Sequence, residues 1–418
     1  MVIGVPPACR QTGLPIKNKY YKQMKPSILF VTTSSNWPLT DGKRQRTWFL
    51  IEALSKKFNV DLLFIGYQSE KNQIEKSTNT INKLFFFDIA DTKLPDLGYP
   101  SFLLSKKQKS NNNFIIHQIE NLFSELNDKN QYSFVFSRYI WPLLILALPK
   151  GVKMVCDIDD VYFEAQKSRI QNETNFLRKL KLQVLFVFGT KKVKKLLNRI
   201  DIPIIVKESD RIFYGLKKAI CVPNIPFGFY IDKKSPIHNA SVAPADTMKF
   251  GFIGKLSFRP NYLGLIEFIN SVWNPLIKIK SEIRLVIAGS GEMPEILKSA
   301  IEKSQNIDFI GFVESPEIFW KQIYTLIVPI EEGAGSNIKI AEAFIHGKAV
   351  IANPFASRGY ENFIDSPYLF LPKNNEEWIK SMVSINVISS DQSNILSTKA
   401  KKLFDLKNWN QTLLDALS

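Results

Sequence analysis

Short apolar runs alternate with longer amphipathic segments along most of the chain. The apolar runs predict strands at residues 28–33, 60–65, 84–89, 133–137, 152–156, 249–253, 283–288, 307–310, 325–329, 349–353 and 368–371. Apolar residues with a helical period predict helices between them, at residues 43–57, 114–126, 262–279, 293–303 and 337–346. Strands that alternate with helices are typical of parallel sheets covered on both faces, so the pattern predicts an α/β fold.

One stretch, residues 224–248, interrupts this alternation with prolines and polar residues. A chain of 418 residues is also longer than one ordinary domain. We therefore expect two doubly wound, Rossmann-like domains, at residues 26–223 and 249–400, joined by this linker. Residues 1–25 lack periodicity and are interpreted as a flexible leader. Ligands of doubly wound sheets bind at the carboxyl ends of the strands, so the expected site is an interdomain cleft.

A glycine-rich turn between two predicted strands carries the strongest chemical signal. Gly333 and Gly335 allow backbone N–H groups to approach a ligand closely. Ser336 and Asn337 are favourable N-cap residues, so a helix is expected to begin there with its positive dipole end facing the turn. Such an arrangement favours phosphate binding.

Charged residues accompany this turn. Lys339 falls in the first helical turn and Glu342 one turn later, so a cation and a carboxylate lie on the same side of the helix, close to the glycine-rich turn. A diphosphate attached to a ribose would use Lys339 for its phosphates and Glu342 for its sugar hydroxyls. Lys255 and Arg259 follow another strand of the same predicted sheet, where two cations would neutralise a diphosphate leaving group. The alternative is that Lys255 and Arg259 lie on a solvated loop without a function. Because Lys339 lies on another loop at the same edge of the sheet, we favour a role in binding the diphosphate.

Three further strand ends give weaker signals. The turns at residues 289–292 and 311–314 are either tight connections, the commoner case, or the walls of a nucleobase pocket. The acidic turn at residues 157–160 has the spacing of a divalent-metal site, but it lies in the other half of the chain from the phosphate-binding loops. A strand-end turn with one acidic residue facing the cleft is therefore favoured.

The net charge of +16 favours anionic partners such as nucleic acid, an anionic membrane or phosphorylated small molecules. Residues 167–199 contribute more than half of it, with ten basic residues and one acid. Apolar residues recur there at helical spacing, which fits either an anionic membrane surface or a core-facing helix with a solvated basic face. No recognised motif supports binding to nucleic acid.

Other chemistry is excluded by what the chain lacks. Its three cysteines have neither a disulfide framework nor zinc spacing, which favours a reducing, cytoplasmic compartment. The three histidines are far apart, so a catalytic triad is not expected. No apolar run has the length of a membrane span.

Ordered short motifs run through the second half of the chain. They are Phe252-Ile-Gly-Lys255, Arg259-Pro-Asn261, Leu285-Val-Ile-Ala-Gly289, Gly311-Phe-Val313, Val328-Pro329, Gly333-Ala-Gly-Ser-Asn-Ile-Lys339, Glu342-Ala343, Gly347-Lys-Ala-Val350 and Gly359. The first half adds Leu39-Thr-Asp-Gly42 and Val222-Pro-Asn224. Together these motifs resemble the retaining glycosyltransferases of family 4, among the group 1 glycosyltransferases, which have the GT-B fold. Asn408-Trp-Asn410 resembles the family's closing helix, expected at residues 401–418 and packed on the first domain.

The resemblance implies transfer of a sugar from a nucleotide-sugar donor, with retention at the anomeric carbon and without a metal or other cofactor. Lys255, Arg259 and Lys339 match the residues that act on the diphosphate and are the predicted catalytic residues. Glu342 matches the ribose-binding carboxylate. The other predicted donor-binding residues are Gly254, Gly311, Phe312, Glu332, Gly335, Ser336, Asn337 and Ile338. The predicted acceptor and closing-loop residues are Thr40, Asp41, Gly42 and Asp159.

Three positions depart from the family. Many relatives have a basic residue where this chain has Asn337, and others have a histidine where it has Asp159. Relatives often have a second glutamate eight residues before the ribose-binding one, where this chain has Ala334; Glu331 and Glu332 are nearby but not at that spacing.

We therefore expect a bacterial, metal-independent retaining glycosyltransferase that uses a UDP- or GDP-sugar and acts on a surface polysaccharide or lipid-linked glycan. It is expected in the cytoplasm, at the inner face of the cell membrane. Two alternatives share the fold. One is a UDP-sugar 2-epimerase, and the other is an inactive relative that binds a membrane or a partner through residues 167–199.

Overall fold

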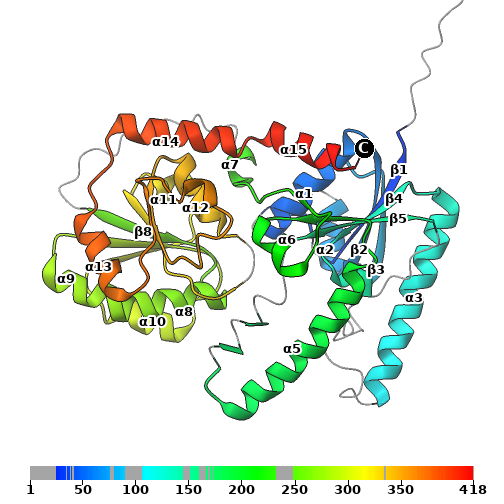
Figure 1. Ribbon diagram of the computed structural model, residues 1–418, viewed down its shortest axis with the longest axis horizontal. Coiled ribbons are helices and arrows are strands. Elements are labelled where there is room, and N and C mark those ends of the chain that lie inside the picture. Colours follow the sequence, from blue (N-terminus) through cyan, green and yellow to red (C-terminus); the bar gives the residue numbers. More distant parts are fainter. Residues whose placement is uncertain are drawn as a thin grey trace, which may run out of the picture.

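The computed structural model describes residues 25–33, 35–37, 39, 42–75, 80–89, 106–144, 151–159, 166–167, 170–171, 173–231, 248–333 and 336–417. These residues form two parallel sheets, one in each half of the chain. Figure 1 shows two lobes, each built around one sheet, and two C-terminal helices that run along both. This arrangement confirms the predicted GT-B architecture.

The first sheet has seven strands in the order β3-β2-β1-β4-β5-β6-β7, all parallel. Its strands are β1 (Ser27–Thr32), β2 (Asn59–Gly66), β3 (Lys83–Asp88), β4 (Phe134–Arg138), β5 (Lys153–Ile158), β6 (Ile202–Ile205) and β7 (Ile220–Cys221). The helices of this half are α1 (Gly42–Ser55), α2 (Gln68–Glu75), α3 (Lys106–Asn130), α5 (Phe176–Leu197), α6 (Glu208–Tyr214) and α7 (Gly228–Ile231).

The second sheet has six parallel strands in the order β10-β9-β8-β11-β12-β13. Its strands are β8 (Lys249–Ile253), β9 (Arg284–Ala288), β10 (Ile307–Gly311), β11 (Thr325–Val328), β12 (Ala349–Ala352) and β13 (Leu369–Phe370). Its helices are α8 (Arg259–Phe268), α9 (Asn274–Ile279), α10 (Glu295–Glu302), α11 (Pro316–Trp320), α12 (Ile338–Ile345) and α13 (Asn375–Ser384). Every residue of β11 and β12 is buried, as expected for central strands with helices on both faces.

The predicted helix at residues 262–279 contains one wide turn. Residues Ile269–Trp273 are π-helical, and the N–H of Asn274 donates to the carbonyl of Ile269. Pro275 follows immediately, lacks an N–H, and cannot fit against the carbonyl four residues earlier in a regular α-helix. The wide turn accommodates this proline, so α8 and α9 form one nearly continuous helix.

The two C-terminal helices connect the lobes. On α14 (Ser390–Leu403), the Ser397 hydroxyl donates to the carbonyl of Ile345 on α12 at 2.6 Å. On α15 (Leu406–Asp415), the Trp409 Nε1 donates to the carbonyl of Pro223 at 2.7 Å, and its ring meets that of Phe227 edge-on. The last helix therefore returns to the first domain, as predicted.

Loops at the carboxyl edges of the two sheets approach each other. A methyl group placed on Gly42, at the start of α1, would lie 3.1 Å from the Cδ1 of Ile338, at the start of α12. A methyl group on Gly359 would lie 3.8 Å from the Cβ of Lys207, which follows β6. The loops that follow β1 and β6 thus face those that follow β11 and β12.

The eleven predicted strands are all present, and two short strands were missed. β6 contains Pro203, which argues against a strand because proline cannot donate to a neighbour, and β7 has two residues. α3 is also longer than predicted. The predicted leader, apart from Lys25, and residues 232–247 of the linker lie outside the described residues. The exact domain boundaries stay predictions.

Candidate functional site

The strand order of the second sheet reverses between β8 and β11. The connections after these strands therefore leave in opposite directions and open a crevice between them, which is where doubly wound sheets bind ligands. Lys255 and Arg259 lie on the first connection, and Lys339 follows the second. The topology brings together the three predicted catalytic residues around one crevice.

The connection after β8 presents exposed cations. Lys255 is exposed, and its carbonyl accepts a hydrogen bond from the Nδ2 of Asn261 at 2.8 Å. Arg259 opens α8, and its Nε lies 2.9 Å from the Oε1 of Glu332, on the other connection. The Arg259 side chain remains 55% exposed while that of Glu332 is 11% exposed, so Arg259 can reach a ligand without leaving this bridge.

Lys339 is less accessible than these two cations. Its Nζ donates to the Oδ1 of Asn261 at 3.2 Å and lies 4.1 Å from the centre of the Phe252 ring. Burial lowers the pKa of Lys339 to about 7, although Glu342 opposes the shift. A methyl group on Gly254 would lie 2.9 Å from this Nζ, so only glycine leaves the amine its place at the end of β8. Because the surroundings compensate the charge incompletely, an anionic ligand would stabilise it.

Glu342 lies one turn further along α12 and is oriented toward the first half of the chain. Its Oε1 and the Nε2 of Gln45, on α1, are both 3.9 Å from the position of a methyl group on Gly228. Burial raises the pKa of the Glu342 carboxyl to about 7, against the effect of Lys339. None of the described side chains donates a hydrogen bond to this carboxylate. The carboxylate is thus placed to receive hydroxyl groups of a ligand.

The turn before α12 differs from the expectation in one detail. The helix begins at Ile338 with Asn337 as N-cap, as predicted, but the Asn337 side chain makes no capping bond. Its Nδ2 instead donates to the carbonyl of Ala356 at 2.9 Å, which fixes the turn against the connection after β12. The Ser336 hydroxyl is buried beside Tyr360. The first N–H groups of α12 are therefore not occupied by a side-chain cap.

Gly311 and Phe312 lie at the same edge of the sheet but further along it. β10 is separated from β8 by β9, and the Phe312 side chain is 69% exposed. The turn after β9 lies between them and the connection after β8. A methyl group on Gly291, in this turn, would lie 2.6 Å from the Ser257 Oγ and 3.4 Å from the Lys255 Cγ. Both predicted residues thus continue the line of loops that begins at Lys255.

Buried ion pairs occupy the corresponding edge of the first sheet. Arg46 binds Asp157 through two nitrogens, at 3.0 and 2.7 Å, and also donates to the Asn224 Oδ1 at 3.0 Å. Arg138 donates to Asp157 at 2.7 Å and to Asp159 at 2.6 Å. The Nδ2 of Asn224 donates to the second oxygen of Asp159 at 2.8 Å. This network joins α1, β4 and β5 to the start of the linker.

Asp159, a predicted acceptor-side residue, belongs to this network. Both of its carboxylate oxygens are engaged, and although burial alone would raise its pKa, Arg138 and Arg46 lower that pKa to about 2. It is thus a buried, ionised group at the end of β5, and a role toward the acceptor stays a prediction. Gly42 lies against Ile338, whereas the predicted residues Thr40, Asp41 and Gly335 lie outside the described residues.

Sequence reasoning missed three groups that shape these edges. Asn261 was part of a quoted motif but had no assigned role, although it contacts both Lys339 and the Lys255 backbone. Arg46 and Arg138 are fully buried. The immediate neighbours of both arginines in the sequence include polar residues, which is equally typical of solvated positions.

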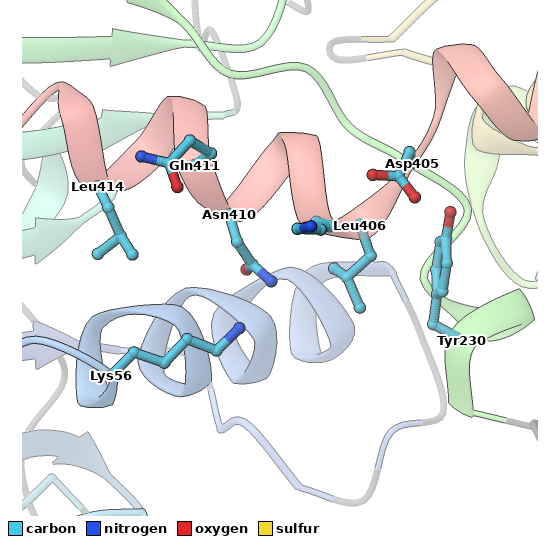
Figure 2. A pocket seen from close by; sticks show the side chains of 8 residues that line it. Lys56, Tyr230, Asp405, Leu406, Asn410, Gln411 and Leu414 are labelled. Carbon is cyan, nitrogen blue, oxygen red and sulfur yellow. The ribbon is translucent and has the colours of Figure 1, made fainter.

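A separate hollow of about 340 Å³ lies between α1 and α15 and includes none of the predicted site residues (Figure 2). Its lining residues are Lys56, Tyr230, Asp405, Leu406, Lys407, Asn410, Gln411 and Leu414. Within the part of the chain that the structure describes, no three His, Cys, Asp or Glu side chains are grouped to hold a metal. Metal independence nevertheless stays a prediction.

A family model matches a large part of the second half of the chain. Residues 247–385 match the family model described as "Glycosyl transferases group 1". This confirms the resemblance to group 1 glycosyltransferases, while the assignment to family 4 stays a prediction. An uncharacterised 44.6 kDa protein in the cps region of Klebsiella pneumoniae is 24% identical over 353 residues, which cover 79% of this chain and 84% of that protein.

Solved structures show the same fold over 94% of this chain. Sucrose-phosphate synthase from Thermosynechococcus elongatus has a TM-score of 0.62 at 11% identity, with 97% of its chain covered. Anabaena Alr3699/HepE in complex with UDP has a TM-score of 0.58 at 12% identity, with 99% covered. A putative UDP-N-acetylglucosamine 2-epimerase from Listeria monocytogenes has a TM-score of 0.55 at 11% identity, with 96% covered. At these identities the likeness shows the GT-B fold alone.

Proposed function

We propose that this protein is a retaining glycosyltransferase that transfers a sugar from a UDP- or GDP-sugar to a surface polysaccharide or lipid-linked glycan. The family match over residues 247–385 supports glycosyl transfer. The relative in a cps region and the neighbour solved with UDP support the choice of acceptor and donor class. The observation that carries the proposal is the placement of Lys339 and Glu342 on one face of α12, beside the crevice between β8 and β11.

The proposed chemistry needs no covalent participation by the protein. The bond between the anomeric carbon and the diphosphate breaks as the acceptor oxygen bonds to the same face of that carbon. The acceptor proton passes to a diphosphate oxygen. Lys339, with Lys255 and Arg259, stabilises the negative charge that develops on the departing diphosphate. Glu342 binds the ribose hydroxyls, and closure of the two domains excludes water.

Ligand binding tests the donor half of this proposal. UDP, GDP and their sugar conjugates are compared by thermal shift and calorimetry on the full chain. A ligand present at about 100 times its Kd should stabilise the protein by about 2.7 kcal/mol and raise its Tm. If no nucleoside diphosphate or nucleotide-sugar binds, the protein is not a nucleotide-sugar enzyme, and the inactive-relative hypothesis gains support.

The neighbour described as a 2-epimerase favours a second candidate, epimerisation of a UDP-sugar. The two activities differ in their need for an acceptor. Conversion of the UDP-sugar to its 2-epimer without any acceptor supports the epimerase, whereas release of the diphosphate that depends on added glycan supports the transferase.

A further inference from the structure

The basic segment at residues 167–199 forms a helix whose two halves have different surroundings. In the C-terminal half of α5, Val193, Leu196 and Leu197 are buried in the core of the first domain. In the N-terminal half, Phe176, Leu177, Leu180 and Val184 are exposed, whereas Phe186 packs against the same core. Figure 1 shows this half of α5 extending away from both lobes. Of the two interpretations of the segment, a core-facing helix therefore leaves the exposed apolar side chains unexplained.

Six exposed apolar side chains define what we call the α5 stripe. Their exposed fractions are 75% for Phe176, 75% for Leu177, 49% for Leu180, 38% for Val184, 51% for Val187 and 42% for Phe188. At about 100° per residue they fall on one side of the helix. Contiguous apolar surface of this kind marks an interaction site, whereas single exposed apolar residues do not.

Basic side chains surround and extend the stripe. The helix and the two residues after it contain eight basic residues and no acidic one. Lys191, Lys194 and Lys195 are exposed and continue the stripe toward the C-terminal end of α5, while Arg178 and Lys181 lie beside it. The surface therefore combines exposed hydrocarbon with a dense positive charge.

We propose that the α5 stripe docks on an anionic lipid bilayer, with its apolar side chains among the headgroups and acyl-chain ends and its lysines against lipid phosphates. Both components of the surface are satisfied by this partner, because an interfacial helix buries its apolar face and attracts anionic lipid through its basic residues. A second copy of the chain would bring the like charges of two α5 helices together. Nucleic acid would neutralise the lysines but leave the apolar stripe in water. Among the described residues, none of the helices could span a membrane.

Vesicle co-sedimentation with the full chain tests the proposal. Vesicles of phosphatidylcholine alone are compared with vesicles that also contain phosphatidylglycerol. A stripe variant carries Phe176→Ser, Leu177→Ser and Leu180→Ser, and its matched control carries Ile279→Ser, Ile296→Ser and Ile395→Ser, which are similarly exposed on other helices. A charge variant carries Lys191→Gln, Lys194→Gln and Lys195→Gln, matched by Lys278→Gln, Lys298→Gln and Lys303→Gln on exposed positions of the second domain. Since all of these positions are exposed, circular dichroism should show an unchanged fold.

We expect the wild type to bind only the anionic vesicles, and less at high salt. The stripe variant should bind at least tenfold more weakly, and the charge variant roughly fivefold more weakly for each lysine lost, while both controls bind like the wild type. Binding by the stripe variant that equals the wild type would assign the interaction to net charge alone and overturn the proposal. So would a failure of the wild type to bind anionic vesicles, or a stripe-dependent dimer detected by sedimentation in place of vesicle binding. Vesicle binding requires no nucleotide-sugar, so its outcome is independent of the proposed function.

Discussion

The carboxyl edges of the two sheets hold their charges in different ways. At the first edge, two arginines and two aspartates are buried and satisfy one another, with Asn224 completing the set. At the second edge, Lys339 contacts an amide oxygen and the face of a ring, and the Glu342 carboxylate receives no hydrogen bond from the described side chains. Burying charge costs free energy unless partners and geometry compensate for it. The first edge is complete without a ligand, and we interpret the second as one that an anionic ligand completes.

The largest effect should follow from removing Asp157. Its carboxylate accepts hydrogen bonds from Arg46 and Arg138, so Asp157→Ala leaves two buried guanidinium groups short of acceptors. Breaking a buried ion pair from one side costs about 3–5 kcal/mol. We expect the free energy of unfolding, measured with urea, to fall by that amount. Lys339→Met is the control at the second edge and should leave the stability unchanged or increase it, because it removes a poorly compensated charge. If Asp157→Ala and Lys339→Met lower the free energy of unfolding equally, the charges at the two edges are not held in different ways.

The next effect concerns ligand affinity. Lys339→Met should weaken the binding of a UDP- or GDP-sugar by about 10- to 150-fold, since a hydrogen bond to a charged group contributes about 1.5–3 kcal/mol. Calorimetry measures this effect, with the exposed Lys321→Met as the matched control. If Lys339→Met and Lys321→Met bind the nucleotide-sugar with the same affinity, Lys339 does not contact the diphosphate.

The pH dependence of binding sharpens the comparison further. Burial lowers the pKa of Lys339 to about 7, so the free protein loses this cation as pH rises above about 7, and affinity for a nucleotide-sugar should fall by up to tenfold per pH unit. Burial raises the pKa of Glu342 to about 7, so the free protein loses this anion as pH falls below about 7, and affinity should fall on the acid side as well. The apparent values belong to the coupled pair. Calorimetry across this range should therefore give a bell-shaped profile that peaks near neutral pH.

Variants assign the two limbs of that profile. Lys339→Met should flatten the alkaline limb, and Glu342→Gln should flatten the acid limb. At the first edge, Arg138 and Arg46 lower the pKa of Asp159 to about 2, so Asp159→Asn should leave the shape of the profile unchanged. A flat profile for the wild-type protein would refute the assignment of the bell to Lys339 and Glu342.

The smallest effect tests how closely the edges approach. A methyl group on Gly42 would lie 3.1 Å from the Ile338 Cδ1, so Gly42→Val should crowd this contact and cost about 1 kcal/mol of donor affinity. Ile338→Ala in the same chain should restore most of that loss, and a double-mutant cycle measures the coupling. Strictly additive effects would indicate that the two residues do not meet in solution.

The sequence predicted best where a single local pattern decides the structure. Apolar runs located eleven strands, and the turn before Ile338 placed the start of α12 correctly. β6 was missed because Pro203 argues against a strand, and its pairing with the neighbours β5 and β7 stabilises it there. Where structure depends on distant partners, local patterns are uninformative. Arg46 and Asp157 are far apart in the sequence, so their pairing could not be predicted.

At the candidate site, too, the features set by local sequence could be predicted and those set by distant partners could not. The edge that carries the site could be predicted, because strands that alternate with helices form a parallel sheet that binds ligands at its carboxyl end, and the glycine-rich turn lies there. The role of the Asn337 side chain could not, since its bond to Ala356 depends on how the connection after β12 packs. Nor could the sequence separate the exposed from the buried face of α5, because apolar residues recur at helical spacing on both while Val193, Leu196 and Leu197 are buried in a core.

The chain passes between the lobes twice, and the two passages touch. The Tyr230 hydroxyl on α7 donates to the carbonyl of Phe404, between α14 and α15, at 2.5 Å. This joint lies beside the candidate site, because Gly228, two residues before Tyr230, faces both Gln45 on α1 and Glu342 on α12. Any movement that draws Gly42 and Ile338 apart must therefore be accommodated next to the hydrogen bond of Tyr230.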